Sequence, residues 1–261
     1  MFAFDLVAAA NLGSEPAYQP LVIAGIIALA AMFSSIAGFA FAAFAGALMF
    51  HVVDDPVRAI QIMIVASIAT QLAGVAGIRH AIDWRATFPF LLGGAATLLP
   101  GVYLLFNMAP QIYLRAIGLL LSVYGLAMLL RPPIVIELDP RRGRLADMLV
   151  GSLGGIMAPL AAFPGAFVPI WCDMRGWDKE RQRGTYQPYI LTMQVASLGL
   201  IQLMQDARGG DATLLLYALP AIVGTQFGVR LFRRLSNAQF RLVLNLCIIC
   251  SGFSLAWGIR Q

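Results

Sequence analysis

Two arginines stand just ahead of long apolar segments and carry the chemistry needed to hold an anion. Arg58 opens the stretch Arg-Ala-Ile-Gln, and Arg183 opens Arg-Gly-Thr-Tyr-Gln. A guanidinium group can grip an oxyanion with two N–H donors at once. We therefore expect Arg58 and Arg183 to capture anions at the two mouths of a pathway. The alternative for both is anchoring at an interface, because arginines often flank apolar segments without binding a ligand.

Several glutamines fall inside apolar segments of helical length, among them Gln187 and Gln194. A polar side chain in such a segment costs free energy unless it is paired, so it tends to face the interior of a helix bundle. These two are about two helical turns apart and therefore share one face of a helix. We expect them to line the same pathway, with hydrogen bonding between helices as the alternative.

Two apolar stretches contain matching interruptions. Residues 40–47 read AFAAFAGA, and residues 159–166 read PLAAFPGA. A helix broken in an apolar environment leaves free N–H groups and about half a positive charge where its second part begins, which suits an anion. The alternative is that small residues here only help helices to pack. The residues at these breaks that we expect to line a binding site are Phe44, Gly46, Phe163, Pro164 and Gly165.

The composition points to a membrane. The chain has 261 residues, of which 60% are hydrophobic and 12% charged, and its mean hydropathy is +0.80. Soluble domains average about 45–50% apolar and about 25% charged residues. A polytopic membrane protein in contact with the lipid bilayer is therefore expected. The net charge of +5 lies in short loops between apolar runs, so we expect no nucleic-acid partner.

The residues that enzymes and metal centres use are sparse and poorly placed. His51 and His80 lie near loops, and no HExxH pattern or nucleophile elbow is present. Cys247 and Cys250 fall within an apolar segment, and no second pair of ligands exists for zinc. We therefore expect a protein that is not an enzyme and has no cofactor or bound metal.

The lengths of the apolar runs, taken with the charges, predict the topology. Runs at about 59–78, 86–106, 112–131, 186–205, 212–231 and 239–259 are each long enough to cross a bilayer. Two others, at about 20–50 and 145–172, are longer than one crossing needs and shorter than two. If each folds back to the side it entered, with the N-terminus outside, fourteen of the eighteen Lys and Arg residues lie inside. Single crossings give no such bias, so re-entrant hairpins are favoured.

The topology and two short repeats predict internal symmetry. The frame AAF-x-GA starts at Ala42 and again 119 residues on, and Val-Ala-Ser starts at Val65 and again 130 residues on. Each half then has one hairpin and three crossings, an odd number of full spans, so the halves enter from opposite faces. We predict an all-α fold of two inverted-topology halves. The boundaries are 1–131 for the N-terminal half, 132–144 for a cytoplasmic linker and 145–261 for the C-terminal half.

The broken segments and the stretches that follow them resemble the sulfite exporter TauE/SafE family, also called the 4-toluene sulfonate uptake permease family. Those stretches read DDPVRAIQIMIVASIATQL and MRGWDKERQRGTYQPYILTMQVASL. The resemblance covers about residues 20–259, with one departure: Ala and Phe stand where the family usually carries a denser GxGGG glycine run. It implies a bacterial inner-membrane, multi-pass permease for small sulfur-containing anions, such as sulfite, sulfoacetate or related sulfonates, often an exporter.

We therefore predict an inner-membrane permease that exports a small sulfur-containing anion by alternating access. The alternatives are an anion-selective channel and a permease for a different small anion, such as a carboxylate. A scaffold without transport is disfavoured because it has no need of matched breaks. The expected partners are the anionic substrate and the lipid bilayer, and a homo-oligomer stays open.

Overall fold

The computed structural model describes residues 19–37, 41–130, 135–205 and 212–231, together with the single positions 249, 253 and 256. Within these residues the regular structure is helical, with no strand, so the predicted all-α class is confirmed. The elements in chain order are α1 (Gln19–Ala37), α2 (Phe41–Val52), α3 (Pro56–Gly77), η2 (Arg79–Ala81), α4 (Trp84–Asn107), α5 (Pro110–Leu130), α6 (Pro140–Ala161), η3 (Pro164–Ala166), α7 (Val168–Met174), α8 (Lys179–Met204), η4 (Ala212–Tyr217) and α9 (Ala218–Leu231).

Aspartates fix where several long helices start. Asp55, Asp83, Asp139 and Asp178 precede α3, α4, α6 and α8, and each carboxylate accepts a hydrogen bond from a backbone N–H of the first turn. Such a cap satisfies a free N–H and complements the helix dipole. The helices therefore begin a few residues before the apolar runs predicted from sequence, and α6 begins inside the segment predicted to be a linker.

The first long apolar run folds back on itself. Helices α1 and α2 pack against each other and are separated by residues 38–40, which lie outside the described residues. The side-chain amide of Gln19, at the start of α1, donates a 2.9 Å hydrogen bond to the carbonyl oxygen of Val52, at the end of α2. Because the first and last residues of the run are joined, the chain returns to the end of the molecule from which it set out.

The second long run also folds back, at the Pro-Gly break. Helix α6 ends at Ala162, whose φ of 52° is left-handed. The chain then passes through η3 into α7 and returns toward the start of α6. There the indole Nε1 of Trp171 donates to Asp147 over 2.6 Å, and Arg175 forms a 3.1 Å ion pair with the same carboxylate. This hairpin is closed by a charged cluster, whereas the first is closed by a neutral hydrogen bond.

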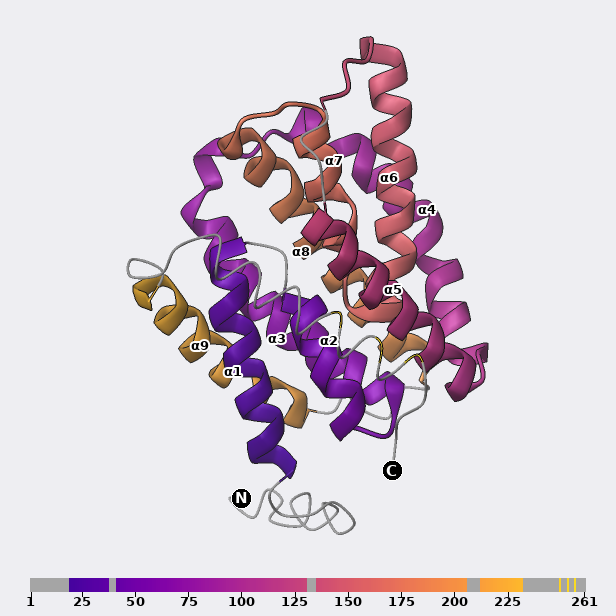
Figure 1. Cartoon of the computed structure of the whole chain (residues 1–261), viewed down its shortest axis with the longest axis vertical. Helices are drawn as coiled ribbons and strands as arrows, with labels where there is room; N and C mark the ends of the chain where they lie inside the picture. Colours follow the sequence, from indigo (N-terminus) through magenta and orange to yellow (C-terminus); the bar gives the residue numbers. More distant parts are fainter. Residues whose placement is uncertain are drawn as a thin grey trace, which may run out of the picture.

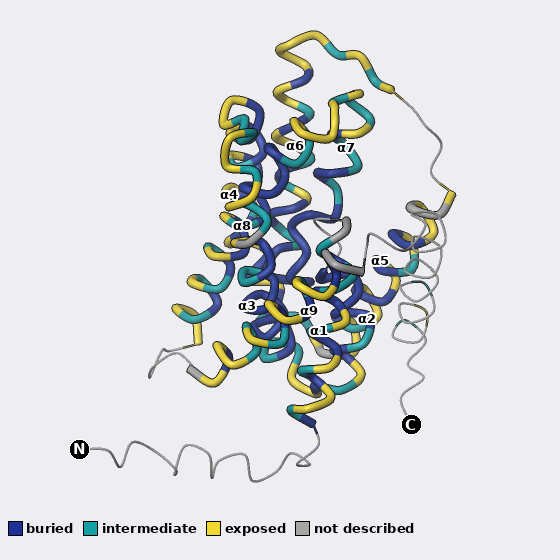
Figure 2. The backbone as a smooth tube through the Cα atoms, turned by 90° about the vertical axis from the view of Figure 1, so that its left-hand side faces the viewer, coloured by how far each residue is buried: buried dark blue, intermediate teal, exposed yellow. Residues whose placement is uncertain are grey.

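The two hairpins open toward opposite ends of the molecule. In Figure 1, α1 begins at the bottom, whereas α6 begins at the top and α7 runs back toward that end. The view turned by 90° in Figure 2 gives the same vertical order. An inverted repeat requires this arrangement, although the position of the two halves in a membrane remains a prediction.

Two close helix crossings repeat this relationship in detail. On one side of the molecule α4 packs along α6, and on the other α9 packs along α1 (Figure 1). A side chain at Gly93 of α4 would collide with the backbone carbonyl of Met148 in α6, and one at Gly224 of α9 would collide with that of Ala28 in α1. Residues 28 and 148 lie 120 positions apart, and residues 93 and 224 lie 131 apart. These separations differ by one residue from the offsets of the two sequence repeats.

One helical turn farther along each crossing, the residues in contact are related by the same two offsets. The Thr97 hydroxyl of α4 donates to the carbonyl oxygen of Ser152 in α6 over 2.6 Å. The corresponding residues of α9 and α1 are Gly228 and Met32, and a side chain at Gly228 would collide with the Met32 carbonyl oxygen. In both crossings the residue numbers rise together, so the paired helices are parallel. Small residues allow the two backbones to touch, as is common where helices associate in membranes.

Most of the described cationic residues gather at one end. The segments at the top of Figure 1 are η2, the starts of α4, α6 and α8, and the end of α7. Arg58 and Arg115 lie near the starts of α3 and α5, at the opposite end. The cationic residues that belong to the top segments are Arg79, Arg85, Arg141, Arg142, Arg144, Arg175, Lys179, Arg181 and Arg183.

The outer surface of the helix bundle is apolar. Along α4 the large side chains of Trp84, Phe88, Leu99 and Tyr103 are each more than half exposed, and exposed positions follow the outside of this helix in Figure 2. Among the described residues, α3 and α4 are long and apolar enough to cross a bilayer. The predicted span at 239–259 lies outside the described residues except for three positions.

Candidate anion-binding site

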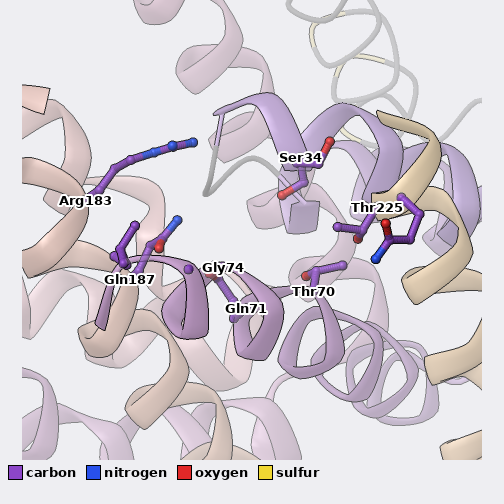
Figure 3. Close-up of a pocket in the computed structure, with 11 residues that line it drawn as sticks. Ser34, Thr70, Gln71, Gly74, Arg183, Gln187 and Thr225 are labelled. Carbon is purple, nitrogen blue, oxygen red and sulfur yellow. The ribbon is translucent and has the colours of Figure 1, made fainter. Parts of the chain in front are cut away.

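A polar cavity of about 410 Å³ lies between four helices (Figure 3). It is framed by α1 and α9 on one side and by α3 and α8 on the other. Its volume falls in the range of about 300–1,000 Å³ that is usual for small-molecule sites. The lining residues are Ser34, Ser35, Thr70, Gln71, Gly74, Gly77, Ile78, Arg183, Gln187, Thr225 and Gln226.

Helix α8 contributes Arg183 and Gln187 to the cavity. These residues are four apart near the start of the helix, so their side chains lie on one face. Gly74 of α3 faces Gln187, and a Cβ built on Gly74 would lie 3.3 Å from the Gln187 amide nitrogen. The absence of a side chain at Gly74 therefore makes room for the amide. In Figure 3, Arg183 reaches from α8 across the cavity, toward the side where Ser34 and Thr225 lie.

The charge of the lining favours an anion. Arg183 is the single charged side chain among the lining residues of the described cavity, and the others are neutral hydroxyls, amides, glycines and one isoleucine. A guanidinium at the edge of a cavity that contains no carboxylate attracts negative charge and offers paired N–H donors. Of the predicted site residues, the structure brings Arg183 and Gln187 together here.

A row of polar side chains continues from the cavity along the contact between α3 and α8. Gln194 is buried, and its amide nitrogen donates to the hydroxyl oxygen of Ser67 over 2.6 Å. Farther on, Gln61 donates to Gln205 over 2.8 Å. Gly74 faces Gln187 and Ser67 faces Gln194, so the two helices run antiparallel. Two residues farther along the contact, the same register places the two Val-Ala-Ser segments, 65–67 in α3 and 195–197 in α8, opposite each other.

Three buried polar atoms along this row have no hydrogen-bond partner among the described residues. They are Oε1 of Gln187, Oε1 of Gln194 and the hydroxyl oxygen of Ser197. Buried polar groups normally find a partner, and leaving one unmade costs about 1–3 kcal/mol. Unmet hydrogen-bonding capacity is therefore concentrated on the face of α8 that contains Gln187 and Gln194.

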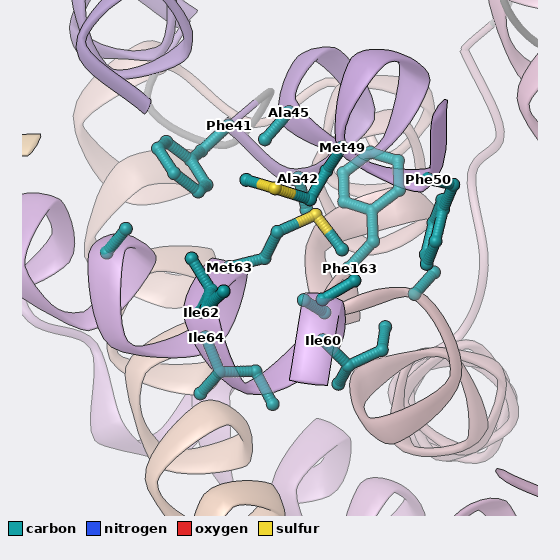
Figure 4. Packing of buried hydrophobic residues seen from close by; sticks show 14 of the residues in the cluster. Phe41, Ala42, Ala45, Met49, Phe50, Ile60, Ile62, Met63, Ile64 and Phe163 are labelled. Atoms are coloured by element: carbon teal, nitrogen blue, oxygen red, sulfur yellow. The ribbon is translucent and has the colours of Figure 1, made fainter. Parts of the chain in front are cut away.

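The residues predicted at the two breaks lie in the apolar core instead of around the polar cavity. Phe44 packs on Phe33 with ring centroids 4.8 Å apart, and Phe163 packs edge-on to Tyr124 at 5.1 Å. Figure 4 shows Phe163 among the surrounding Met and Ile side chains. Gly46, Pro164 and Gly165 are also buried.

The second break nevertheless meets the polar row at one point. The Gln194 amide nitrogen lies 3.4 Å from the carbonyl oxygen of Ala162, the residue at which α6 ends. No buried cation is needed for this contact, because the broken helix supplies the polar group. The part played by Phe44, Gly46, Phe163, Pro164 and Gly165 in binding remains a prediction.

Arg58 lies far from the polar cavity. It is half-buried in the first turn of α3, sixteen residues before Gly74. At 1.5 Å per residue this corresponds to about 24 Å along the helix. Arg58 and Arg183 therefore lie near opposite ends of the molecule, as two separate mouths would require, and they cannot hold the same small anion.

The hydroxyl residues of the lining were not predicted from sequence. Ser34, Thr70 and Thr225 are small polar residues in largely apolar helices, and such residues commonly bond to their own backbone. Thr70 and Thr225 do so, to the carbonyl oxygens of Ser67 and Ala221. The available signal was indirect: Gly224 directly precedes Thr225, and a glycine in an apolar helix often marks a close contact with another helix.

Residues suited to metal binding are scattered. Within the described ranges, no group of three or more His, Cys, Asp or Glu side chains could hold a metal ion. Cys172 is buried and has no disulfide. Cys247 and Cys250 lie outside the described residues.

Comparison with known proteins identifies the family. The model of the sulfite exporter TauE/SafE family matches residues 23–255, which is nearly the whole chain. The chain belongs to this family. Searches of curated proteins and of solved structures gave no match. TauE/SafE proteins are membrane transporters of sulfite- and sulfonate-type anions and not enzymes, so a membrane location and a role in transport follow for this chain.

Proposed function

We propose that this TauE/SafE protein is an inner-membrane permease that exports a small sulfur-containing anion. A sulfonate such as sulfoacetate, or sulfite itself, is the expected substrate. The observation that carries the proposal is the cavity between α1, α3, α8 and α9, in which Arg183 is the single charged side chain among the described lining residues. A guanidinium can bind two oxygens of a sulfonate or sulfite group at once.

The route across the protein follows the contact between α3 and α8. The cavity lies at one end of this contact, and Gln194, Ser67, Gln61 and Gln205 continue the polar row toward the other. Polar side chains at membrane depth face the bundle interior and often mark substrate pathways. The pathway ends near Arg58, which is proposed as the second point of anion capture.

Alternating access follows from two inverted halves, 1–131 and 145–261, joined by a cytoplasmic linker at 132–144. Matched crossings of α4 on α6 and of α9 on α1 support this division. A repeat of this kind can rock about a central site and expose it to each side in turn. The central site here is the crossing of α3 and α8, where the two Val-Ala-Ser segments meet.

The proposed orientation places the N-terminus outside. The cationic end of the molecule then faces the cytoplasm, in agreement with the positive-inside rule. Three of the lining residues, Gly77, Ile78 and Arg183, lie near this end, and we place the opening of the cavity there. An exporter binds its substrate while its cavity is open to the cytoplasm. The membrane potential then favours export of an anion by about 2.3 kcal/mol per charge per 100 mV.

Transport by the purified chain in liposomes tests this proposal. Saturable counterflow of sulfite or sulfoacetate, with no response to a carboxylate control such as acetate, is expected. Arg183→Gln should lower apparent affinity about 10- to 100-fold, because a hydrogen bond to a charged group is worth about 1.5–3 kcal/mol. Arg58→Gln should slow flux from the opposite side.

Arg144→Gln serves as the matched control, because Arg144 is exposed and is not part of the cavity lining. Its transport should equal that of the wild type. Undiminished flux in both Arg183→Gln and Arg58→Gln would remove the proposed site. Non-saturating flux without counterflow would replace the carrier with an anion channel.

A further inference from the structure

We infer that the substrate is a hydroxyl-bearing organic sulfonate, whose acid group binds Arg183 and whose hydroxyl donates a hydrogen bond to Gln187. The inference rests on the proposed function and narrows the class of anion. It is carried by the hydrogen-bonding state of the cavity lining, which combines one strong set of donors with several acceptors.

The first observation is the unpaired acceptor on Gln187. This side chain is only 4% exposed, and its Oε1 has no hydrogen-bond partner among the described residues. Gly74 lies directly against the amide, so the side chain is confined beside the cavity. The oxygen has almost no accessible surface, so a turn of the terminal amide is needed to present it to the cavity. A ligand hydroxyl that then reaches it supplies the missing donor, whereas a ligand without a donor leaves it unpaired.

The second observation is that neighbouring hydroxyls also present acceptors. The hydroxyl hydrogens of Ser35, Thr70 and Thr225 are donated to the backbone carbonyl oxygens of Met32, Ser67 and Ala221, at 2.7–2.8 Å. Their oxygens are left with lone pairs that can only accept. The lining therefore offers a ligand several acceptors in addition to the donors of Arg183, and an anion without a donor of its own would meet these oxygens unfavourably.

The third observation concerns charge and spacing. The described lining contains no carboxylate, so nothing in it would balance a ligand ammonium group. A neutral hydroxyl is therefore the fitting donor. Arg183 and Gln187 are one helical turn apart, about 6 Å along the axis. A spacer of about two carbons between the sulfur and the hydroxyl lets a ligand reach both, and a cavity of about 410 Å³ is large enough for such a molecule.

Binding of two probes of equal charge tests the inference. Calorimetric titration of the full-length protein in nanodiscs would compare 2-hydroxyethanesulfonate with ethanesulfonate, which differ only in the hydroxyl. The wild type should bind the hydroxylated probe about tenfold more tightly, the value expected when a buried acceptor gains its partner. Gln187→Met keeps the length of the side chain and removes the acceptor, so it should bring the two dissociation constants within about twofold of each other.

Gln111→Met is the matched control, because Gln111 is exposed on α5 and is not part of the cavity lining. It should keep the tenfold preference. Equal binding of both probes to the wild type, or an unchanged preference in Gln187→Met, would overturn the inference and leave the proposed function standing. Failure of both sulfonates to bind the wild type would overturn the proposed function and this inference with it. Thermal melting of each variant shows whether it is folded before its affinities are read.

Discussion

The crossing of α4 on α6 and the crossing of α9 on α1 make the same backbone contact but surround it with different side chains. In the crossing of α4 on α6, the ring of Tyr189 from α8 lies against Gly94 and Gly154. Its hydroxyl donates to the carbonyl oxygen of Gly151 over 2.7 Å, and the residue is fully buried. The space that the glycines leave at the α4–α6 crossing is therefore filled by a large aromatic side chain.

The corresponding positions in the other crossing bear different side chains. The offsets of 131 and 120 residues relate Gly94 to Thr225 and Gly154 to Ser34, both of which line the polar cavity. A tyrosine against two glycines fills space, whereas the two hydroxyl residues line a cavity and make it polar. Side chains thus distinguish a filled crossing from a crossing beside a cavity, although the two pairs of backbones meet in the same way.

The largest expected effect on stability comes from removing the Tyr189 ring from the α4–α6 crossing. Tyr189→Ala should lower the free energy of unfolding by about 3–5 kcal/mol, because it removes a buried ring and leaves a hollow between α4 and α6. Chemical denaturation in detergent would measure the loss. Tyr189→Phe, which removes only the hydroxyl, should cost about 1 kcal/mol. Equal losses of unfolding free energy for the two variants would mean that the ring does not stabilise the α4–α6 crossing.

A smaller effect should be shared by the two crossings. Gly93→Ala and Gly224→Ala each place a methyl group against a backbone carbonyl of the neighbouring helix. Each should lower the free energy of unfolding by about 1–3 kcal/mol, the usual cost of overpacking. Gly199→Ala is the control, because a Cβ there meets nothing within 4 Å, and it should be neutral or stabilising. A loss in one crossing alone would contradict their equivalence.

The smallest effect concerns the closure of the first hairpin. Gln19→Met removes the hydrogen bond to Val52 and keeps the length of the side chain. The loss should be about 0.5–1.5 kcal/mol, as for a neutral hydrogen bond. The cluster of Asp147, Trp171 and Arg175 closes the second hairpin with a charge-assisted bond, so Asp147→Asn should cost more. If Gln19→Met lowered the melting temperature more than Asp147→Asn, the two hairpins would not differ in stability as their contacts imply.

Much of the architecture could be predicted from local features of the sequence. The apolar composition predicted membrane helices, and the length of two runs together with the charge distribution predicted that each would fold back. These predictions work because segment length, charge and breaks act locally and need no knowledge of which helices touch. The spacing of Arg183 and Gln187 on one helix face was readable for the same reason.

The contents of the site could not be predicted in the same way. The structure packs Phe44 on Phe33 and Phe163 on Tyr124, contacts that no local pattern reveals, and the part of the two breaks in binding an anion stays a prediction. Ser34 and Thr225 line the cavity because α9 packs along α1, which no pattern within either helix reveals.

By itself the sequence determined the all-α membrane class, the two folded-back runs, the repeat offsets and the helix face that bears Arg183 and Gln187. Each of these depends on residues near one another in the chain. The tertiary structure alone decided where the cavity lies, which hydroxyls line it, and that Tyr189 fills the space beside the glycines of the α4–α6 crossing. The physical reason is that a cavity is the volume left between helices distant in sequence, and its place depends on how closely their backbones approach.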